Sequence, residues 1–213
     1  DIAEEAAQVF NRLCMAQVME ETHHLLVAPK CLQNKVLDFI EEEICHADNN
    51  EPAYIGVKMN SLTDKTIIDK MVEASQHGVK IDLVVRGICC LIPGIEGYTE
   101  NIRVISIVGR YLEHSRIYIF GTPERDKMFI SSADFMTRNM VKRVEVATPI
   151  YDTAIKDRVR TMFGIMLHDT VKGRELCRDG NYYRREKPQE ESEVISSQAY
   201  FSNEAYLAAS KNV

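Results

Sequence analysis

The sequence predicts an α/β fold in which a mixed β-sheet is sandwiched between helices on its two faces. Short apolar runs alternate with segments of helical periodicity in the first half of the chain, and several short apolar runs follow one another in the second half. With 213 residues, of which 45% are hydrophobic and 27% charged, the chain can bury a sizeable core as one soluble globular domain. The sequence contains no internal repeat, and its apolar runs are far shorter than a membrane span.

The first half of the chain supplies the alternation of helices and strands. Pro29 stops the first apolar run, Thr63 or Asp64 can cap the third helical segment, and Gly78 can end it. The predicted helices cover residues 2–20, 30–47 and about 64–77, and the predicted strands cover residues 25–28, 53–59 and 79–86.

The second half is richer in strands. A loop with one proline and three glycines is expected over residues 87–101, and residues 132–142 are expected to be irregular or a short helix. After Gly180 the composition turns polar and charged, so residues 181–213 are expected to form a polar C-terminal tail. The predicted strands cover residues 103–108, 115–120, 127–131 and 143–147, the last ended by Pro149, and a long helix covers residues 152–168.

Charge and cysteine content narrow the class of protein. The net charge of −6 argues against general nucleic-acid binding, and the first residues do not resemble a signal peptide. Residues 80–145, however, contain ten basic and eight acidic side chains, and a mildly basic middle suits a local site for a polyanion. The six cysteines lack the C-x-x-C spacing of a metal or redox site, which favours free thiols in a cytosolic protein.

Basic side chains stand at the ends of four predicted strands, where open α/β sheets usually bind ligands. His114 and Arg116 are two residues apart, so a strand would place them on one side, where they could bind an anion such as a phosphate group. The other candidates for such a site are Lys58, Arg86 and Arg143. Arg143 alternates with Glu145 on a predicted strand, so the two are expected to share a face of it. Each has a plainer interpretation as a surface residue or as half of a structural ion pair, and Arg143 could pair with Glu145 or Asp134.

Several common ligand sites are not indicated by the sequence. There is no P-loop and no G-x-G-x-x-G motif, so a bound nucleotide would not be held in either of those ways. The acidic residues and histidines form no pattern typical of metal ligands, and we expect no metal site within this chain.

Five runs of the sequence together resemble the C-terminal part of bacterial polyphosphate kinase of type 1, over residues 1 to about 180. They share the order and spacing of the family's motifs. The runs are Lys58-Met-Asn-Ser-Leu62, Val84-Val-Arg-Gly-Ile-Cys-Cys-Leu91, Ile105-Ser-Ile-Val-Gly-Arg110 with Leu112-Glu-His-Ser-Arg116, Ser131-Ser-Ala-Asp134 with Arg138-Asn139, and Arg143-Val-Glu-Val146.

This resemblance implies a phospholipase-D-like fold and a domain organisation. Residues 1–22 would be a helix leading from a preceding domain, and residues 23–180 would be the second of two tandem phospholipase-D-like catalytic domains. The family reversibly transfers the terminal phosphate of ATP to polyphosphate through a phosphohistidine, which would lie in the first tandem domain and thus outside this chain. His114 matches a second active-site histidine, Arg86 and His114 would contact the phosphates of the nucleotide, and Arg143 would add positive charge.

The resemblance also implies a cofactor, partners and a location. Mg²⁺ would be needed, with its ligands outside this chain, and the substrates would be ATP or ADP and inorganic polyphosphate. The partners would be the rest of the kinase chain and, in the parent protein, further copies in a homo-oligomer, but no nucleic acid. The location would be cytoplasmic, including the inner face of the membrane.

Some residues depart from the wider phospholipase-D signature, H-x-K followed by an Asp and then G-S-x-N. Arg116 replaces the lysine, Gly121 stands where the Asp would fall, and Ser131-Ser-Ala-Asp134 replaces G-S-x-N. Phe135 stands where the kinase motif has a tryptophan. These changes weaken the alternative of a phosphodiesterase or nuclease that would use His114 as nucleophile. A second alternative is that the isolated chain is inactive and only binds polyphosphate or mediates assembly.

Overall fold

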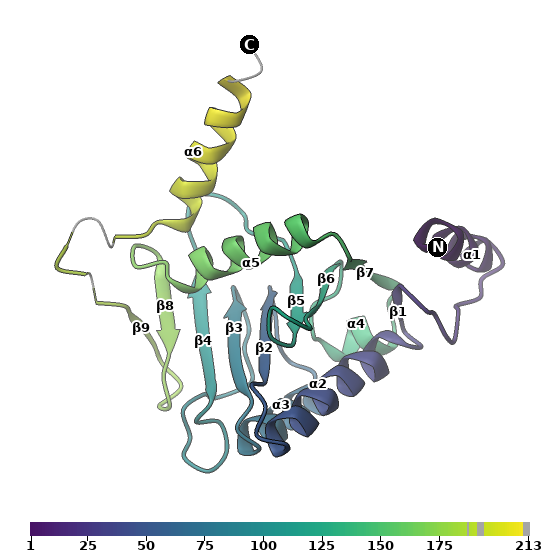
Figure 1. The fold of residues 1–213 in the computed structure, drawn as a ribbon, viewed down its shortest axis with the longest axis horizontal. Helices are drawn as coiled ribbons and strands as arrows, with labels where there is room; N and C mark the ends of the chain where they lie inside the picture. The colour runs from purple at the N-terminus through teal and green to yellow at the C-terminus, as the bar shows by residue number, and fades with distance from the viewer. Residues whose placement is uncertain (187, 191–193, 211–213) are drawn as a thin grey trace.

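The computed structural model describes residues 1–186, 188–190 and 194–210. In this part of the chain one large mixed sheet carries helices on both faces, which confirms the predicted fold class (Figure 1). The helices are α1 (Ile2–Cys14), α2 (Leu32–Asp48), α3 (Lys65–Gln76), α4 (Thr137–Val141), α5 (Thr153–Leu167) and α6 (Ser197–Ser210). The strands are β1 (Leu26–Ala28), β2 (Tyr54–Met59), β3 (Lys80–Val85), β4 (Ile102–Ile107), β5 (Ile117–Phe120), β6 (Lys127–Ser131), β7 (Glu145–Ile150), β8 (Gly173–Leu176) and β9 (Tyr182–Arg184).

The strand order of the sheet determines which chain segments meet. Its order is β1-β7-β6-β5-β2-β3-β4-β8-β9, with β2, β3 and β4 parallel and the other neighbours antiparallel. Lys58, near the end of β2, lies opposite Ile117, the first residue of β5. The carboxyl ends of β2, β3 and β4 therefore share one edge of the sheet with the start of β5 and the end of β6.

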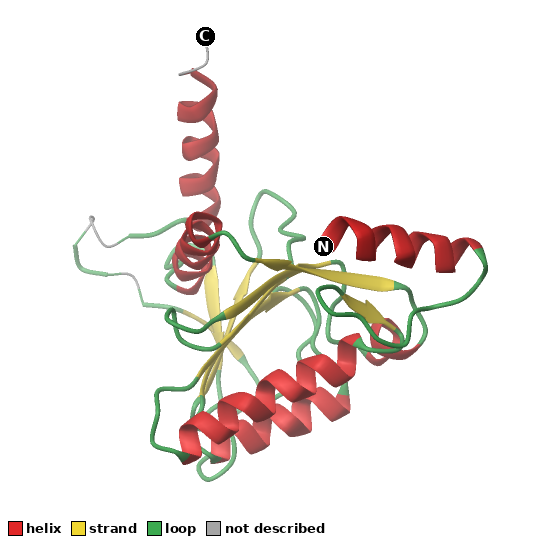
Figure 2. Ribbon diagram, turned by 45° about the vertical axis from the view of Figure 1, so that its right-hand side comes forward, coloured by secondary structure: helices red, strands yellow, loops and turns green. Residues whose placement is uncertain are grey.

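Two apolar layers hold the helices against the sheet. α2 and α3 cover one face and α5 the other, as the edge-on view shows (Figure 2). Side chains alternate along each strand. On β3, for example, Leu83 faces the layer of α2 and α3, whereas Val84 faces Phe163 and Met166 of α5. This burial on both faces is the reason that the central strands are continuous apolar runs in the sequence.

Side-chain caps define the helix ends that the sequence suggests. The Asp64 carboxylate accepts a hydrogen bond from the amide of Ile67 at 3.1 Å, and the Asp152 carboxylate accepts one from the amide of Ile155 at 2.9 Å. Gly78 follows α3 with a φ of +87°, a conformation that favours glycine. The predicted positions of the third and the long helix are confirmed to within a few residues.

The predicted strand at residues 143–147 was placed too early. β7 begins at Glu145 and continues through Pro149 to Ile150, and Arg143 lies before it. β1 pairs with β7 only as far as Ala147, so the later part of β7 has an open side on which a proline needs no hydrogen-bond partner. β8 and β9 were missed because they are short and mostly polar on one side.

The described part of residues 181–213 contains regular structure where a polar tail was expected. It includes β9 and the helix α6, which projects from the body of the domain (Figure 1). Ser197 and Gln198 at the start of α6 are buried, and the Asp169 carboxylate accepts hydrogen bonds from the Ser197 amide at 2.8 Å and hydroxyl at 2.6 Å. These long-range polar contacts leave no periodicity in the sequence. The part of the expected tail at residues 187, 191–193 and 211–213 lies outside the described residues.

At the other end of the chain, the predicted first helix is present but ends at Cys14 rather than near residue 20. The buried carboxylate of Glu5 accepts hydrogen bonds from the amides of His24 at 2.9 Å and Leu25 at 2.7 Å, which fastens α1 to the strand that follows. Among the described residues, no helix is both long and apolar enough to cross a membrane.

Candidate functional site

Basic side chains converge at the sheet edge formed by the ends of β2 and β3 and the start of β5. Lys58 lies near the end of β2, Arg86 directly follows β3, and His114 and Arg116 directly precede β5. The backbone holds the first two segments together, because the amide of Gly87 donates to the carbonyl of Asn60 at 2.8 Å. A β-carbon at Gly87 would lie 3.0 Å from that carbonyl, a tight contact, so the close approach favours glycine.

Lys58 is a buried cation at this edge, not a snorkelling surface residue. It is 2% exposed, donates to the carbonyl of Ser115 at 2.7 Å and lies 3.5 Å from the Glu113 carboxylate. Burial lowers the pKa of Lys58, as do the charges of Arg116 and Arg86, while Glu113 acts in the opposite direction. Lys58 thus ties the segment before β5 to the end of β2.

Arg86 is half-buried and held at one side of its guanidinium. Its Nε donates to Oδ1 of Asn60 at 2.9 Å, and its carbonyl accepts from the Ser106 hydroxyl at 3.1 Å. Because only Nε is used in this bond, the two terminal nitrogens can face outward as donors for an anionic ligand.

Arg116 is paired with Asp134, which follows the end of β6. Nε and Nη2 of Arg116 each lie 3.2 Å from a different carboxylate oxygen of Asp134, a bidentate geometry. Asn60 adds its amide at 2.7 Å and its Nδ2 at 3.2 Å to the same carboxylate. Burial acts to raise the pKa of Asp134, but the hydrogen bonds from Arg116 and Asn60 outweigh it, and the pKa lies below its ordinary value.

His114 is the exposed member of the group and leans on Arg116. Nη1 of Arg116 lies 3.1 Å from Nδ1 of the ring and 2.9 Å from the His114 carbonyl, and Nη2 lies 3.3 Å from Nε2. The two ring nitrogens point in divergent directions, so one guanidinium cannot make linear hydrogen bonds to both, and it lies against the ring. The predicted neighbourhood of His114 and Arg116 is present, although β5 begins only at Ile117 and both residues precede it.

Arg143 is set apart from these residues. It is exposed in the turn between α4 and β7, and its amide donates to the carbonyl of Arg138 at 3.0 Å. The expectation that Arg143 and Glu145 share a strand face is therefore wrong, because only Glu145 belongs to β7. The Glu145 carboxylate is buried and accepts hydrogen bonds from Ser132 and Asn139. Arg143 lies at the same sheet edge but two strands away from β5.

Sequence reasoning did not assign a site role to Asn60, Glu113 or Asp134, which connect the basic residues. Asn60 follows Lys58 by two residues, and Asp134 departs from the G-S-x-N signature just as Arg116 departs from H-x-K. The two departures are in direct contact, since Arg116 and Asp134 form the bidentate pair. Two simultaneous departures from the signature could have indicated that Arg116 and Asp134 are in contact. The sequence alone does not show this contact, because the two residues are 18 positions apart.

The carboxylates at this edge do not fit a metal site. Asp134 is engaged by Arg116 and Asn60, and Glu113 lies beside Lys58. Among the described residues, no cluster of three or more acidic, histidine or cysteine side chains could hold a metal ion. The expectation that Mg²⁺ is bound by residues outside this chain stays a prediction.

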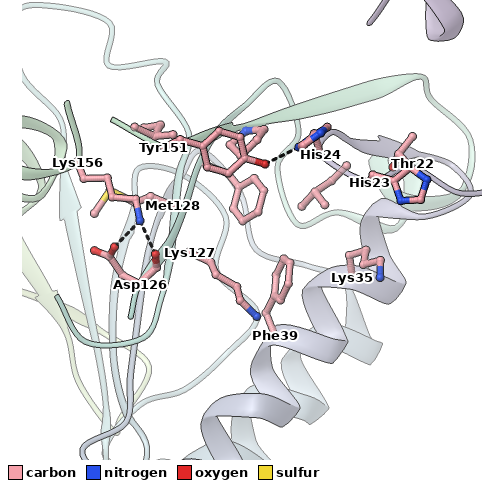
Figure 3. Close-up of a pocket in the computed structure, with 14 residues that line it drawn as sticks. Thr22, His23, His24, Lys35, Phe39, Asp126, Lys127, Met128, Tyr151 and Lys156 are labelled. Carbon is pink, nitrogen blue, oxygen red and sulfur yellow. Dashed lines mark hydrogen bonds and ion pairs between the residues drawn. The ribbon is translucent and has the colours of Figure 1, made fainter. Parts of the chain in front are cut away.

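A cavity of about 460 Å³ lies at the opposite edge of the sheet, between the start of β6 and the segment before β1 (Figure 3). His24 Nδ1 lies 2.7 Å from the Tyr151 hydroxyl at its rim, and Lys127 stacks on the Phe39 ring at 4.8 Å. Lys156 donates to the Asp126 carboxylate at 2.9 Å. None of the basic residues predicted to bind an anion lines this cavity.

Comparison with known proteins places the chain in a family. The family described as "Polyphosphate kinase C-terminal domain 2" matches residues 25–198. The chain belongs to the polyphosphate kinase family. It is 51% identical over 183 residues to a polyphosphate kinase of Bacillus cereus, which covers 86% of this chain and 26% of that protein. It is 47% identical over 205 residues to the enzyme of Staphylococcus epidermidis, covering 96% of this chain and 28% of that protein.

Solved structures agree with this assignment. The crystal structure of polyphosphate kinase from Porphyromonas gingivalis matches 100% of this chain with a TM-score of 0.89 at 33% identity, over 32% of its own length. Nuc of Salmonella typhimurium, a phospholipase D family member, matches 72% of this chain and 96% of its own, with a TM-score of 0.52 at 16% identity. The second likeness concerns the fold alone, and it confirms the phospholipase-D-like architecture.

The chain spans roughly a quarter to a third of the length of the polyphosphate kinases that it matches. The family match begins close to the predicted boundary at residue 23 and extends past residue 180 into α6.

Proposed function

We propose that this chain is the second of two tandem catalytic domains of polyphosphate kinase, and that it supplies half of a composite site for phosphoryl transfer between ATP and polyphosphate. The observation that carries the proposal is that Lys58, Arg86 and Arg116 meet at one sheet edge, where Arg116 lies against the exposed ring of His114. The family assignment gives this basic cluster a phosphate-containing substrate. The phosphohistidine of the reaction would belong to the preceding domain.

The geometry suits the chemistry that phosphoryl transfer demands. The protein's main contributions to such reactions are positioning and neutralisation of the charge on the phosphoryl oxygens. Arg86 offers its terminal nitrogens to those oxygens. His114, exposed and supported from below by Arg116, can donate a hydrogen bond or a proton to a phosphate oxygen. Lys58 and Arg116 add positive charge from beneath, and Arg143 adds it from further along the same edge.

The decisive test is His114→Ala in the full-length kinase. If His114 contacts the transferred phosphate, ATP-dependent polyphosphate synthesis should fall on the order of 1,000-fold, because a positioned acid–base group contributes ~10²–10⁴ in rate. The matched control is His24→Ala, which removes a histidine bonded to Tyr151 at the opposite edge and should leave the rate within about twofold. Retention of most of the activity by His114→Ala would refute the proposed role.

A further inference from the structure

The residues between Arg86 and His114 form one continuous hydrogen-bonded path. Arg86 bonds to Asn60 at 2.9 Å, Asn60 to Asp134 at 2.7 Å, and Asp134 to Arg116 at 3.2 Å. Nη1 of Arg116 then donates to the His114 carbonyl at 2.9 Å and lies 3.1 Å from Nδ1 of the ring. We propose that Asn60 and Asp134 are positioning residues for phosphoryl transfer, and that they set the spacing of Arg86 and His114 through this path. The inference rests on the proposed function and assigns roles that the site residues alone do not reveal.

The donors of Arg116 are directed into the protein. Nε and Nη2 are bonded to Asp134, and Nη1 lies against the carbonyl and ring of His114. The Arg116 side chain is 12% exposed. The main role of Arg116 is therefore to support the imidazole of His114, while Arg86 and His114 contact the phosphate directly. Asp134 fixes the plane of the guanidinium and, through it, the orientation of the ring.

Asn60 suits the connecting position because its amide both accepts and donates. Its Oδ1 accepts from Arg86, whereas its Nδ2 and backbone amide donate to Asp134. An aspartate here could accept from Arg86 but would place a second carboxylate beside Asp134. Neither a charged nor an apolar side chain could make both side-chain bonds, so the link from Arg86 to Asp134 through the side chain depends on the amide, while the backbone bond to Asp134 holds residue 60 in place.

The surrounding backbone keeps the path rigid. Asn60 and Asp134 are 5% and 7% exposed. Leu62 pairs with Phe135 in an isolated parallel bridge, and the amide of Thr63 donates to the Phe135 carbonyl at 2.8 Å. Buried, fully bonded polar groups hold one arrangement far better than exposed ones, and an error of ~1 Å in such an arrangement can reduce catalysis about 100-fold.

The test compares Asp134→Asn with Asp82→Asn in the full-length kinase. Asp82 is an equally buried aspartate, 3% exposed, that pairs with Arg103 at 3.0 Å away from the site. Both variants lose a buried ion pair, so both should lower the melting temperature. Only Asp134→Asn should also lower kcat, by about 10- to 100-fold, with the KM for ATP changed less than about threefold. Asp134→Glu, which keeps a carboxylate for Arg116, should recover part of kcat.

A second measurement separates positioning from general damage. Asp134→Asn and Arg116→Lys disrupt the same pair, so the double variant should be no slower than the slower single variant. Multiplicative losses, or a kcat for Asp134→Asn equal to that of Asp82→Asn, would overturn the inference while leaving the role of His114 intact. If His114→Ala itself keeps its activity, the proposed function fails and the inference fails with it.

Discussion

Two buried aspartates at opposite ends of β6 hold cations in different ways. Asp126, just before β6, binds Lys156 at 2.9 Å and also Arg160, which in turn is paired with Asp157 at 2.6 Å. Asp134, just after β6, binds Arg116, whose remaining nitrogen lies against the exposed ring of His114. In the first network every charged side chain is paired with another member of the network, although Asp157 is exposed, so we call it closed. The second network ends at an exposed imidazole that a ligand can reach, and this difference directs attention to the Asp134 end of β6.

The closed network should matter most for stability. Asp126→Ala leaves the partly buried cations of Lys156 and Arg160 without their shared partner, so the free energy of unfolding should fall by about 3–5 kcal/mol. Urea denaturation of the 213-residue chain measures this loss. Asp157→Ala removes only the exposed partner of Arg160 and should cost less than about 1 kcal/mol. Equal losses in the two variants would show that the network at this end of β6 is not closed as described.

In the network that ends at His114, Arg86→Ala should reduce the catalytic rate. Loss of its terminal nitrogens should reduce kcat/KM for ATP in the full-length kinase about 100-fold, equivalent to ~2.7 kcal/mol. Arg143→Ala offers a comparison at the same edge. Because Arg143 is exposed and two strands away from β5, its charge is screened and its loss should cost less than about tenfold. A larger effect of Arg143→Ala than of Arg86→Ala would reverse this ranking of the two arginines.

Acid should weaken the fold partly through Asp134. Its pKa in the folded chain lies below the ordinary value of 3.8, so the unfolded chain binds the proton more readily. This contribution to stability is present above about pH 4 and is lost as the pH falls through the lower, folded pKa. Asp134→Asn removes the titrating group, and its urea midpoint should fall less than that of the wild type between pH 5 and pH 3, on the order of a few tenths molar urea. Parallel slopes in the two proteins would contradict the assignment.

The sequence predicted the helices and strands better than the hydrogen bonds between distant residues. Continuous apolar runs revealed β2 and β3 because both faces of these strands are buried, and Asp64 and Asp152 indicated helix starts because caps are local. The basic residues at strand ends could also be predicted, because each directly follows or precedes an apolar run in the sequence. Asn60 and Asp134 were not assigned a role, because a contact between residues 74 positions apart leaves no trace in spacing or periodicity. β9 and α6 escaped prediction because composition alone does not show where a polar segment docks.

The smallest effect is expected from Gln198, which joins α6 to the loop that leads to His114. Its Nε2 donates to the Tyr111 carbonyl at 2.8 Å, and its Oε1 accepts from the Tyr111 amide at 3.0 Å. Gly109 lies so close to Gln198 that a β-carbon there would collide with the side-chain amide. Gln198→Ala removes two neutral hydrogen bonds, each worth about 1 kcal/mol, and leaves the path from Arg86 to His114 in place.

Gln198→Ala should therefore lower kcat of the full-length kinase about threefold through a looser loop, with the KM for ATP unchanged. Leu207→Ala is the matched control, because this side chain is 64% exposed on the same helix. If Gln198→Ala reduced kcat as much as His114→Ala, α6 would belong to the same functional unit as Asp134, Arg116 and His114. The site would then extend from the sheet edge into the C-terminal helix.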